Sequence, residues 1–171
     1  MSGHVTQTVD RYLELAGKPI ESLKKVATPC IDDHQIPLEE FTVKGELSPI
    51  AARVYLKALC VARVARMDLM WSVNMLAREV TRWTAACGRR LHRLSSWMHH
   101  SSDHMQIYYV GDKPSECNLV LFSDASFAGD LRDSKSTSGG VLCLVGSNTY
   151  VPINWLCKKQ TQFRTPPRSR R

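Results

Sequence analysis

The chain has 171 residues, 43% of them hydrophobic, which is enough to bury the core of one ordinary domain or of parts of two. The formal net charge is +7, but four arginines among the last eight residues leave only +3 for residues 1–163. This mildly basic charge over residues 1–163 permits contact with nucleic acid without requiring it. No apolar run is long enough for a transmembrane helix, which argues against a membrane-spanning function or a membrane partner.

Six cysteines are spread along the chain, and none forms the Cys-x-x-Cys pair that is typical of zinc sites. Because no signal peptide precedes them, we expect reduced thiols and an intracellular protein, in the cytoplasm or the nucleus. His100 and His104 have the i, i+4 spacing of zinc ligands on a helix. The intervening residues 101–103 are typical of a helix end, so we expect no metal site there.

The first half of the chain predicts helices separated by an irregular stretch. Apolar residues recur at helical spacing from Val5 to Gly17, where the glycine predicts the end of the helix. Residues 18–49 contain four prolines and predict loops. The pair Asp32-Asp33 invites comparison with a polymerase metal site, but no apolar hairpin strands flank it. We interpret it as a solvated loop.

Three further helices are predicted between residues 50 and 99. The first begins at Ile50, the second follows Asp68, which we expect to cap it, and the third spans about residues 84–99. One face of the third helix carries Arg89, Arg90 and Arg93. A basic face of this kind is able to contact phosphates, although the alternative is an ordinary solvated helix face.

The stretch from Leu119 to Gln160 predicts three strands in an antiparallel meander, at 119–124, 140–145 and 150–157, with a further short strand over 105–110. The first strand delivers the carboxylate of Asp124 at its end, beside a turn rich in serine, threonine and lysine. Metal-assisted phosphoryl chemistry uses such carboxylates, but it needs several of them around Mg²⁺. The alternative is that Asp124 is only a turn residue.

The residues of this stretch closely resemble the ribonuclease H domain of Ty1/copia-type retrotransposon Pol polyproteins. The resemblance is carried, in order, by Ser-Asp-Ala-Ser-Phe-Ala-Gly-Asp at 123–130, Ser-Lys-Ser-Thr-Ser-Gly-Gly at 134–140 and Trp-Leu-Cys-Lys-Lys-Gln at 155–160. It implies a mixed sheet with helices, two bound metal ions and hydrolysis of the RNA strand of an RNA–DNA hybrid. It also implies that Asp124 is the first metal-binding acid.

Earlier segments resemble, more loosely, the part of the same polyproteins that follows the polymerase active site. The matching segments include Thr28-Pro29, residues 58–63, Asp68-Leu69 and residues 91–94. The resemblance therefore divides the chain into a helical reverse-transcriptase thumb and connection region at 1–104, a truncated ribonuclease H-like domain at 105–162 and a basic tail at 163–171. The expected fold class is α+β, with helices followed by an incomplete three-stranded meander.

Most of the acids that the resemblance requires are missing. The family's polymerase half carries Tyr-x-Asp-Asp, which this sequence lacks, and its ribonuclease H half continues after Lys-Lys-Gln-Thr with a helix that supplies the second acid. We therefore expect neither activity, and no stably bound Mg²⁺. An apolar sheet face left without its covering helix should favour aggregation or a partner.

The tail, Phe163 to Arg171, contains two prolines, four arginines and no carboxylate. The family's usual continuation is near Val-Ser-His-Ser-Ser-Thr-Glu-Ser-Glu, and a coding string that we constructed for it yields the observed tail when its first base is dropped. We infer a frameshift or a misassigned gene boundary near Gln162. The rival interpretation is a basic address or nucleic-acid-binding tail. We expect the tail to be disordered and dispensable.

Three functions remain open from the sequence. The first is a catalytically inactive remnant of a Pol polyprotein. The second is a module that binds RNA–DNA hybrid or other nucleic acid, with no small-molecule substrate. The third is a nuclease that recruits its missing acids from another chain. The candidate nucleic-acid contacts are Arg89, Arg90, Arg93, Ser126, Ser136, Thr137, Ser138, Lys158, Lys159 and Gln160.

Overall fold

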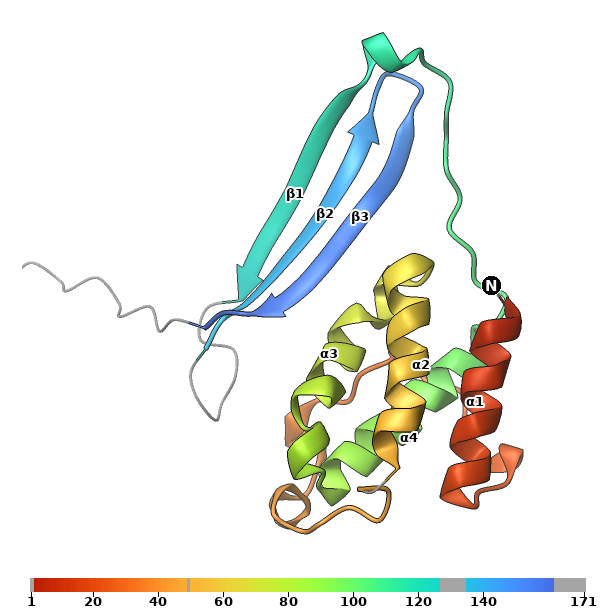
Figure 1. Cartoon of the computed structure of the whole chain (residues 1–171), viewed down its shortest axis with the longest axis vertical. Helices are drawn as coiled ribbons and strands as arrows, with labels where there is room; N and C mark the ends of the chain where they lie inside the picture. Colours follow the sequence, from red (N-terminus) through yellow and green to blue (C-terminus); the bar gives the residue numbers. More distant parts are fainter. Residues whose placement is uncertain (1, 49, 127–134, 162–171) are drawn as a thin grey trace, which may run out of the picture. The chain divides into compact units, whose positions relative to one another are not determined.

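A computed structural model describes residues 2–48, 50–126 and 135–161 of the chain (Figure 1). The chain divides into two compact units, one ending at Gln106 and the other beginning at Ile107. The first unit is helical and the second is a sheet, so the predicted α+β class is confirmed. The predicted tail at 163–171 and part of the quoted motif, residues 127–134, lie outside the described residues.

Four α-helices form the helical unit, as the sequence predicts. They are α1 (Ser2–Ala16), α2 (Ala51–Val64), α3 (Met70–Arg78) and α4 (Ala85–His100), and short 3₁₀ turns occupy Ile20–Ser22, Asp33–Gln35, Leu38–Phe41, Met67–Leu69 and Val80–Arg82. Helix α1 contacts α2 and α4, and α3 packs on α2 and α4. Their shared core includes Tyr12, Leu76, Leu91, Leu94 and Met98, each at most 1% exposed.

Helix α1 ends where its sequence predicts. Gly17 has φ of +59°, a left-handed conformation that glycine adopts without steric cost. The Gly17 amide donates to Glu14 O at 3.4 Å and the Lys18 amide donates to Leu13 O at 3.1 Å. This pair of bonds is a Schellman motif, which satisfies carbonyl groups that the helix end leaves without partners.

Two predictions for the helical unit are wrong, because the carboxylates of Asp68 and Asp33 form hydrogen bonds and ion pairs with other side chains. Asp68 does not cap α3, whose N-cap residue is Leu69; its carboxylate accepts hydrogen bonds from Arg66 and Trp97 instead. Asp33 lies in a loop region as expected, but it forms an ion pair with Arg90 of α4 and so is not merely solvated.

The second unit contains three strands in the order β1-β2-β3, all antiparallel. The strands are β1 (Asn118–Ser126), β2 (Thr137–Val145) and β3 (Tyr150–Lys159), and a 3₁₀ turn at Pro114–Glu116 precedes them. The predicted meander is confirmed, with each strand longer than predicted. Thr137 and Ser138 were expected in a turn but begin β2, because they pair with Ser126 and Ala125 of β1.

The predicted strand at 105–110 does not form. Its one ladder contact is a bridge between Tyr109 and Tyr150. The segment is instead pinned to the β2–β3 loop by polar contacts: the amides of Gly111 and Asp112 donate to Thr149 Oγ1, and the Asp112 carboxylate accepts from the Asn148 amide at 2.6 Å. The hydrogen bond from the Asn148 amide, with smaller contributions from the Thr149 and Asn148 side chains, keeps the pKa of Asp112 below its ordinary value.

Candidate nucleic-acid interface at one end of the sheet

Asp124 lies within β1, two residues before the strand ends, and its side chain is exposed. Its Oδ1 accepts a hydrogen bond from the Ala125 amide at 2.8 Å. Its partner across the ladder is Gly139, which has no side chain to cover the carboxylate. The carboxylate therefore remains open to a ligand approaching this end of the sheet.

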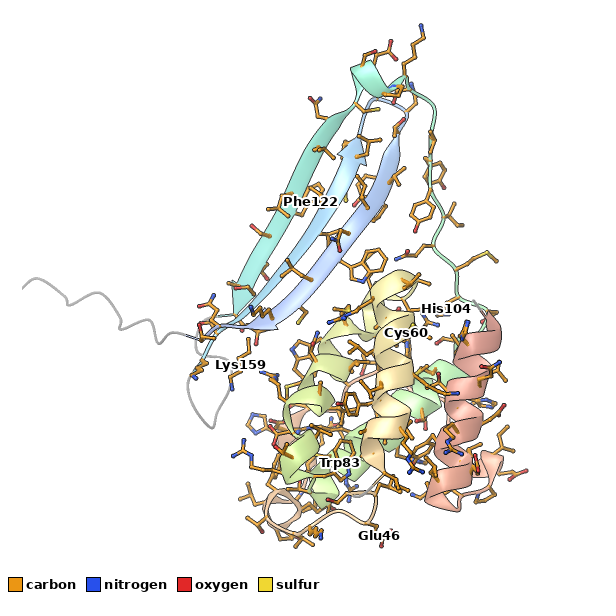
Figure 2. All side chains as sticks on the ribbon, viewed as in Figure 1. Glu46, Cys60, Trp83, His104, Phe122 and Lys159 are labelled. Carbon is orange, nitrogen blue, oxygen red and sulfur yellow. The ribbon has the colours of Figure 1, made fainter. Side chains whose placement is uncertain are left out.

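The register brings polar residues from all three strands to the same end of the sheet. Ser126 pairs with Thr137, which pairs with Lys159; one step inward, Ala125 pairs with Ser138, which pairs with Lys158. Directly paired residues share a face and successive residues alternate. Figure 2 shows Lys159 at this end of the sheet, with Phe122 farther along β1.

The two faces of this end consequently present different groups. One face carries Asp124, Ser126, Thr137 and Lys159, a carboxylate and a cation with two hydroxyls between them. The opposite face carries Ser138 and Lys158, and the Gln160 side-chain amide donates to Ser138 Oγ at 2.8 Å.

Hydrogen bonds fix the strand ends that carry these residues. The Thr137 amide donates to Ser126 Oγ at 3.1 Å, and the Gln160 amide donates to Ser136 O at 2.8 Å. Ser136 is 8% exposed, so little of it is open to a ligand. The structure thus gathers the sheet residues singled out from the sequence, which we call the sheet-end cluster: Asp124, Ser126, Ser136, Thr137, Ser138, Lys158, Lys159 and Gln160.

The sheet-end cluster does not fit the Mg²⁺ site that the family resemblance implies. Two-metal chemistry needs several carboxylates within a few ångströms. Of the other acids described in this unit, Asp112 and Glu116 precede β1, in which the six residue steps from Asn118 to Asp124 span about 20 Å. Over residues 2–48, 50–126 and 135–161, no group of three or more His, Cys, Asp or Glu side chains is placed to hold a metal ion.

The arginines of α4 have partners inside the helical unit. Arg89 pairs with Glu40, and this pairing raises the pKa of Arg89 and lowers that of Glu40. Arg90 is 7% exposed, pairs with Asp33 and lies over the Phe41 ring.

Arg93 donates to Thr28 O at 3.0 Å and to Thr28 Oγ1 at 3.2 Å. The three arginines therefore attach the irregular segment between residues 28 and 41 to α4. They belong to a different unit from the sheet-end cluster.

The histidines that the sequence singled out are also placed. His100 ends α4, and its Nε2 lies 2.9 Å from Leu23 O in a hydrogen bond. His104 follows the helix and stacks edge-on against Trp97. The two therefore lie on different elements of backbone, although their sequence spacing is that of a helical pair.

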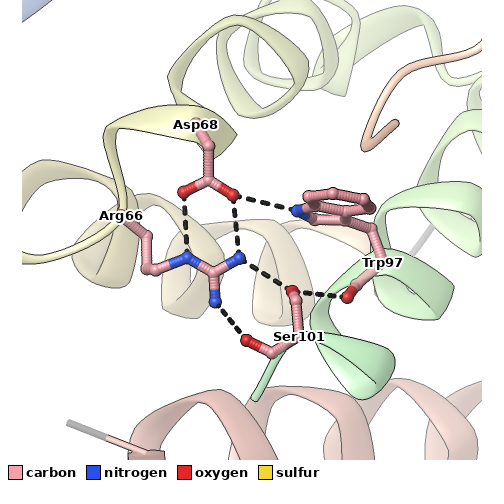
Figure 3. Close-up of polar contacts among 4 residues, drawn as sticks. All are labelled: Arg66, Asp68, Trp97 and Ser101. Carbon is pink, nitrogen blue, oxygen red and sulfur yellow. Dashed lines mark hydrogen bonds and ion pairs between the residues drawn. The ribbon is translucent and has the colours of Figure 1, made fainter. Parts of the chain in front are cut away.

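A buried polar cluster around Arg66 was missed by sequence reasoning (Figure 3). Arg66 is 4% exposed; it donates two hydrogen bonds to the Asp68 carboxylate, one to Ser101 O and one to Ser101 Oγ. Trp97 Nε1 donates to the same carboxylate at 2.9 Å. Burial alone would raise the pKa of Asp68, but the bonds from Arg66 and Trp97 outweigh it and lower that pKa. The cluster joins the end of α2 to the end of α4.

A comparison with curated proteins finds a distant relative of this chain. No family model matches the chain, and no solved structure matches it. No helix in the described ranges is both long and apolar enough to cross a membrane. The chain is 30% identical over 146 residues to the Retrovirus-related Pol polyprotein from transposon RE2 of Arabidopsis thaliana.

The alignment covers 85% of this chain but 9% of that polyprotein. It includes parts of both units, because neither unit alone holds 146 residues. The chain is a distant homologue of a copia-type retrotransposon Pol polyprotein and spans about a tenth of its length.

Proposed function

We propose that the chain is a catalytically inactive remnant of a retrotransposon Pol polyprotein. In this proposal, residues 1–104 correspond to the end of the reverse transcriptase and residues 105–162 to the start of ribonuclease H. The observation that carries it is the chemistry around Asp124: one exposed carboxylate, paired across the ladder with Gly139, and no second acid among the described residues of that end.

The test of inactivity is a cleavage and extension assay. Purified full-length chain should neither cut the RNA strand of an RNA–DNA hybrid nor extend a primer, with Mg²⁺ or Mn²⁺ present. Cleavage that is lost in Asp124→Asn would contradict the proposal, whereas cleavage that survives this substitution indicates a contaminating nuclease. Cleavage that arises only on mixing with a chain that supplies acids would favour the complementing nuclease.

Binding of nucleic acid without cleavage is the second candidate, and the sheet-end cluster favours it. Lys158 is exposed. It lies at the end of the sheet where the three strands meet, together with Lys159 and the serines Ser126 and Ser138. Hydroxyls and lysines are common phosphate contacts, and each neutralised phosphate adds to the salt dependence of binding. The ligand expected from the family is an RNA–DNA hybrid.

A salt titration separates these two candidates. If the sheet end binds hybrid through several phosphates, the logarithm of the binding constant should fall steeply with the logarithm of salt concentration. The double substitution Lys158→Ala with Lys159→Ala should reduce the slope by about one, because the two lysines lie on opposite faces of the sheet and a hybrid on one face contacts one of them. The matched control is Lys24→Ala with Lys25→Ala in the helical unit. A shallow slope, unchanged by either double substitution, would leave the inactive remnant without a binding role.

A further inference from the structure

A cleft of about 570 Å³ opens in the helical unit between α1, the turn before α2 and the first two turns of α4. Its volume lies within the range of small-molecule sites. No sequence motif marks it, since its walls come from three separate segments. The residues that the argument uses are Tyr12, Lys18, Lys44, Gly88, Arg89 and His92.

Gly88 makes the cleft open on the α4 side. A Cβ placed on Gly88 would meet no heavy atom within 4 Å, so packing inside the protein does not require a glycine here. Glycine within a helix costs about 0.5–1 kcal/mol relative to alanine. Gly45 differs, because a Cβ there would overlap the backbone of Thr84, the residue just before α4. Gly45 is thus needed for chain packing, while the absence of a side chain at Gly88 leaves open space at the cleft.

Charged groups on the rim favour an anion. The acids Glu40 and Glu46 also line the cleft, but Glu40 is paired with Arg89, so Lys18 and Lys44 face a single remaining carboxylate. Lys18 lies near enough to His92 that its charge, after burial, lowers the pKa of the imidazole. The rim therefore carries a small excess of positive charge.

Hydrogen-bonding and apolar groups complete the cleft. The Tyr12 hydroxyl and His92 Nδ1 lie 2.8 Å apart in a hydrogen bond, and burial raises the pKa of Tyr12 to about 12. Both groups are therefore neutral near pH 7. Apolar contact surface comes from Ala16, Val43, Leu47 and Ala85. A ligand that carries both a phosphate and a flat, partly apolar body matches this combination of groups.

We propose that this cleft binds a phosphate-bearing ligand of nucleotide size. Its phosphate would lie against the ammonium groups of Lys18 and Lys44, and its nucleoside would occupy the space over Gly88. The same chemistry is offered by a free mononucleotide and by the terminal nucleotide of a strand. The cleft shares no residue with the sheet-end cluster, so the proposal stands or falls separately from binding at the sheet.

The test is a titration of the full-length chain with adenosine monophosphate, inorganic phosphate and a single-stranded oligonucleotide, followed by calorimetry and by amide chemical shifts. Adenosine monophosphate should bind saturably and shift the amides of Gly88 and His92. Gly88→Leu should weaken it at least tenfold, because the leucine fills the cleft. Lys18→Ala should weaken it severalfold.

Matched controls are available in the same unit. Gly3 of α1 is also a helical glycine whose added Cβ would meet nothing within 4 Å, but it does not line the cleft, so Gly3→Leu should leave binding unchanged. Lys57→Ala, at an exposed position of α2, should also leave binding unchanged. Leucine is a better helix former than glycine, so both glycine variants should keep their folds.

The outcomes separate the ligand sources. A free nucleotide is indicated if adenosine monophosphate binds more tightly than the oligonucleotide, and a strand terminus if the order is reversed and a 5′-phosphate is needed. The proposal is overturned if neither probe binds saturably, if inorganic phosphate alone binds as well as the nucleotide, or if Gly88→Leu and Lys18→Ala bind like the unaltered chain.

Discussion

The two units bury their apolar side chains very differently. In the helical unit, Leu91 and Leu94 are each 1% exposed, whereas in the sheet unit Leu121 of β1 is 64% exposed and Leu156 of β3 is 53% exposed. Cys143 is the one buried apolar residue among those described from 107 to 161. The helices close around a core, while the sheet has apolar groups on both faces and little to cover them.

The difference follows from what each kind of element needs. A helix buries one stripe, so four helices suffice to cover one another. The β1 run Leu119-Val120-Leu121-Phe122 has no apolar–polar alternation, which is typical of a strand buried on both faces. Three strands alone cannot bury such runs. Most of the hydrophobic stabilisation of this chain should therefore reside in the helical unit.

Matched leucine truncations give the largest contrast between the units. Leu91→Ala should lower the free energy of unfolding of the helical unit by about 2–5 kcal/mol, because it leaves a cavity in the core. Leu121→Ala removes a side chain that is mostly exposed and should cost less than about 1 kcal/mol. Urea unfolding followed by far-ultraviolet circular dichroism measures both. Similar costs for the two variants would mean that another protein surface covers the sheet in solution.

The buried cluster around Arg66 should be the next most sensitive feature. Arg66→Leu leaves Asp68 and Ser101 without their shared donor, and we expect a loss of about 2–4 kcal/mol, discounted because the Asp68 side chain is 37% exposed. The control is Arg11→Leu, which breaks an exposed pair with Glu14 and should cost under about 1 kcal/mol. An equally small loss for Arg66→Leu would show that the cluster is not needed to join α2 to α4.

In the sheet unit, where apolar burial contributes little to stability, the hydrogen bonds that hold residues 109–112 against the β2–β3 loop should matter more. Thr149 is 3% exposed and its hydroxyl accepts from two amides, so Thr149→Ala should cost about 1–3 kcal/mol of local stability. The readout is hydrogen exchange at the Gly111 and Asp112 amides. Thr149→Ser keeps the hydroxyl and should keep most of the protection. Unchanged exchange in Thr149→Ala would contradict the role given to this bond.

The smallest effect should come from pH. Burial and the nearby charge of Lys18 lower the pKa of His92 in the folded chain, so the unfolded chain binds the proton more readily. Stability should therefore be greatest above the ordinary histidine pKa of about 6.5 and should fall as pH decreases through that value toward the folded pKa. Thermal midpoints between pH 7.5 and 5 measure this. In His92→Gln the dependence should flatten; an unchanged slope would assign it to other groups.

Local signals were enough for the order and type of the main elements. Helical spacing of apolar residues predicted α1, α2, α3 and α4, and β-branched and apolar runs predicted the three strands in their antiparallel order. In an antiparallel meander the end of one strand lies beside the start of the next. The residues of the sheet-end cluster, which the sequence singled out, therefore meet at one end of the sheet. The tail prediction at 163–171 stays a prediction, as do the roles of the sheet-end residues.

What the sequence by itself determined is therefore periodicity, element order and the presence of Asp124 with its hydroxyl and lysine neighbours. Only the tertiary structure decided that Arg90 is buried against Asp33, that Asp68 binds Arg66 and Trp97 instead of capping a helix, and that Gly88 faces open space. The physical reason is that a charged or polar side chain is satisfied by whichever partner the fold brings within about 3 Å, and partners such as Asp33 for Arg90 and Trp97 for Asp68 are remote in sequence. Periodicity carries no information about them.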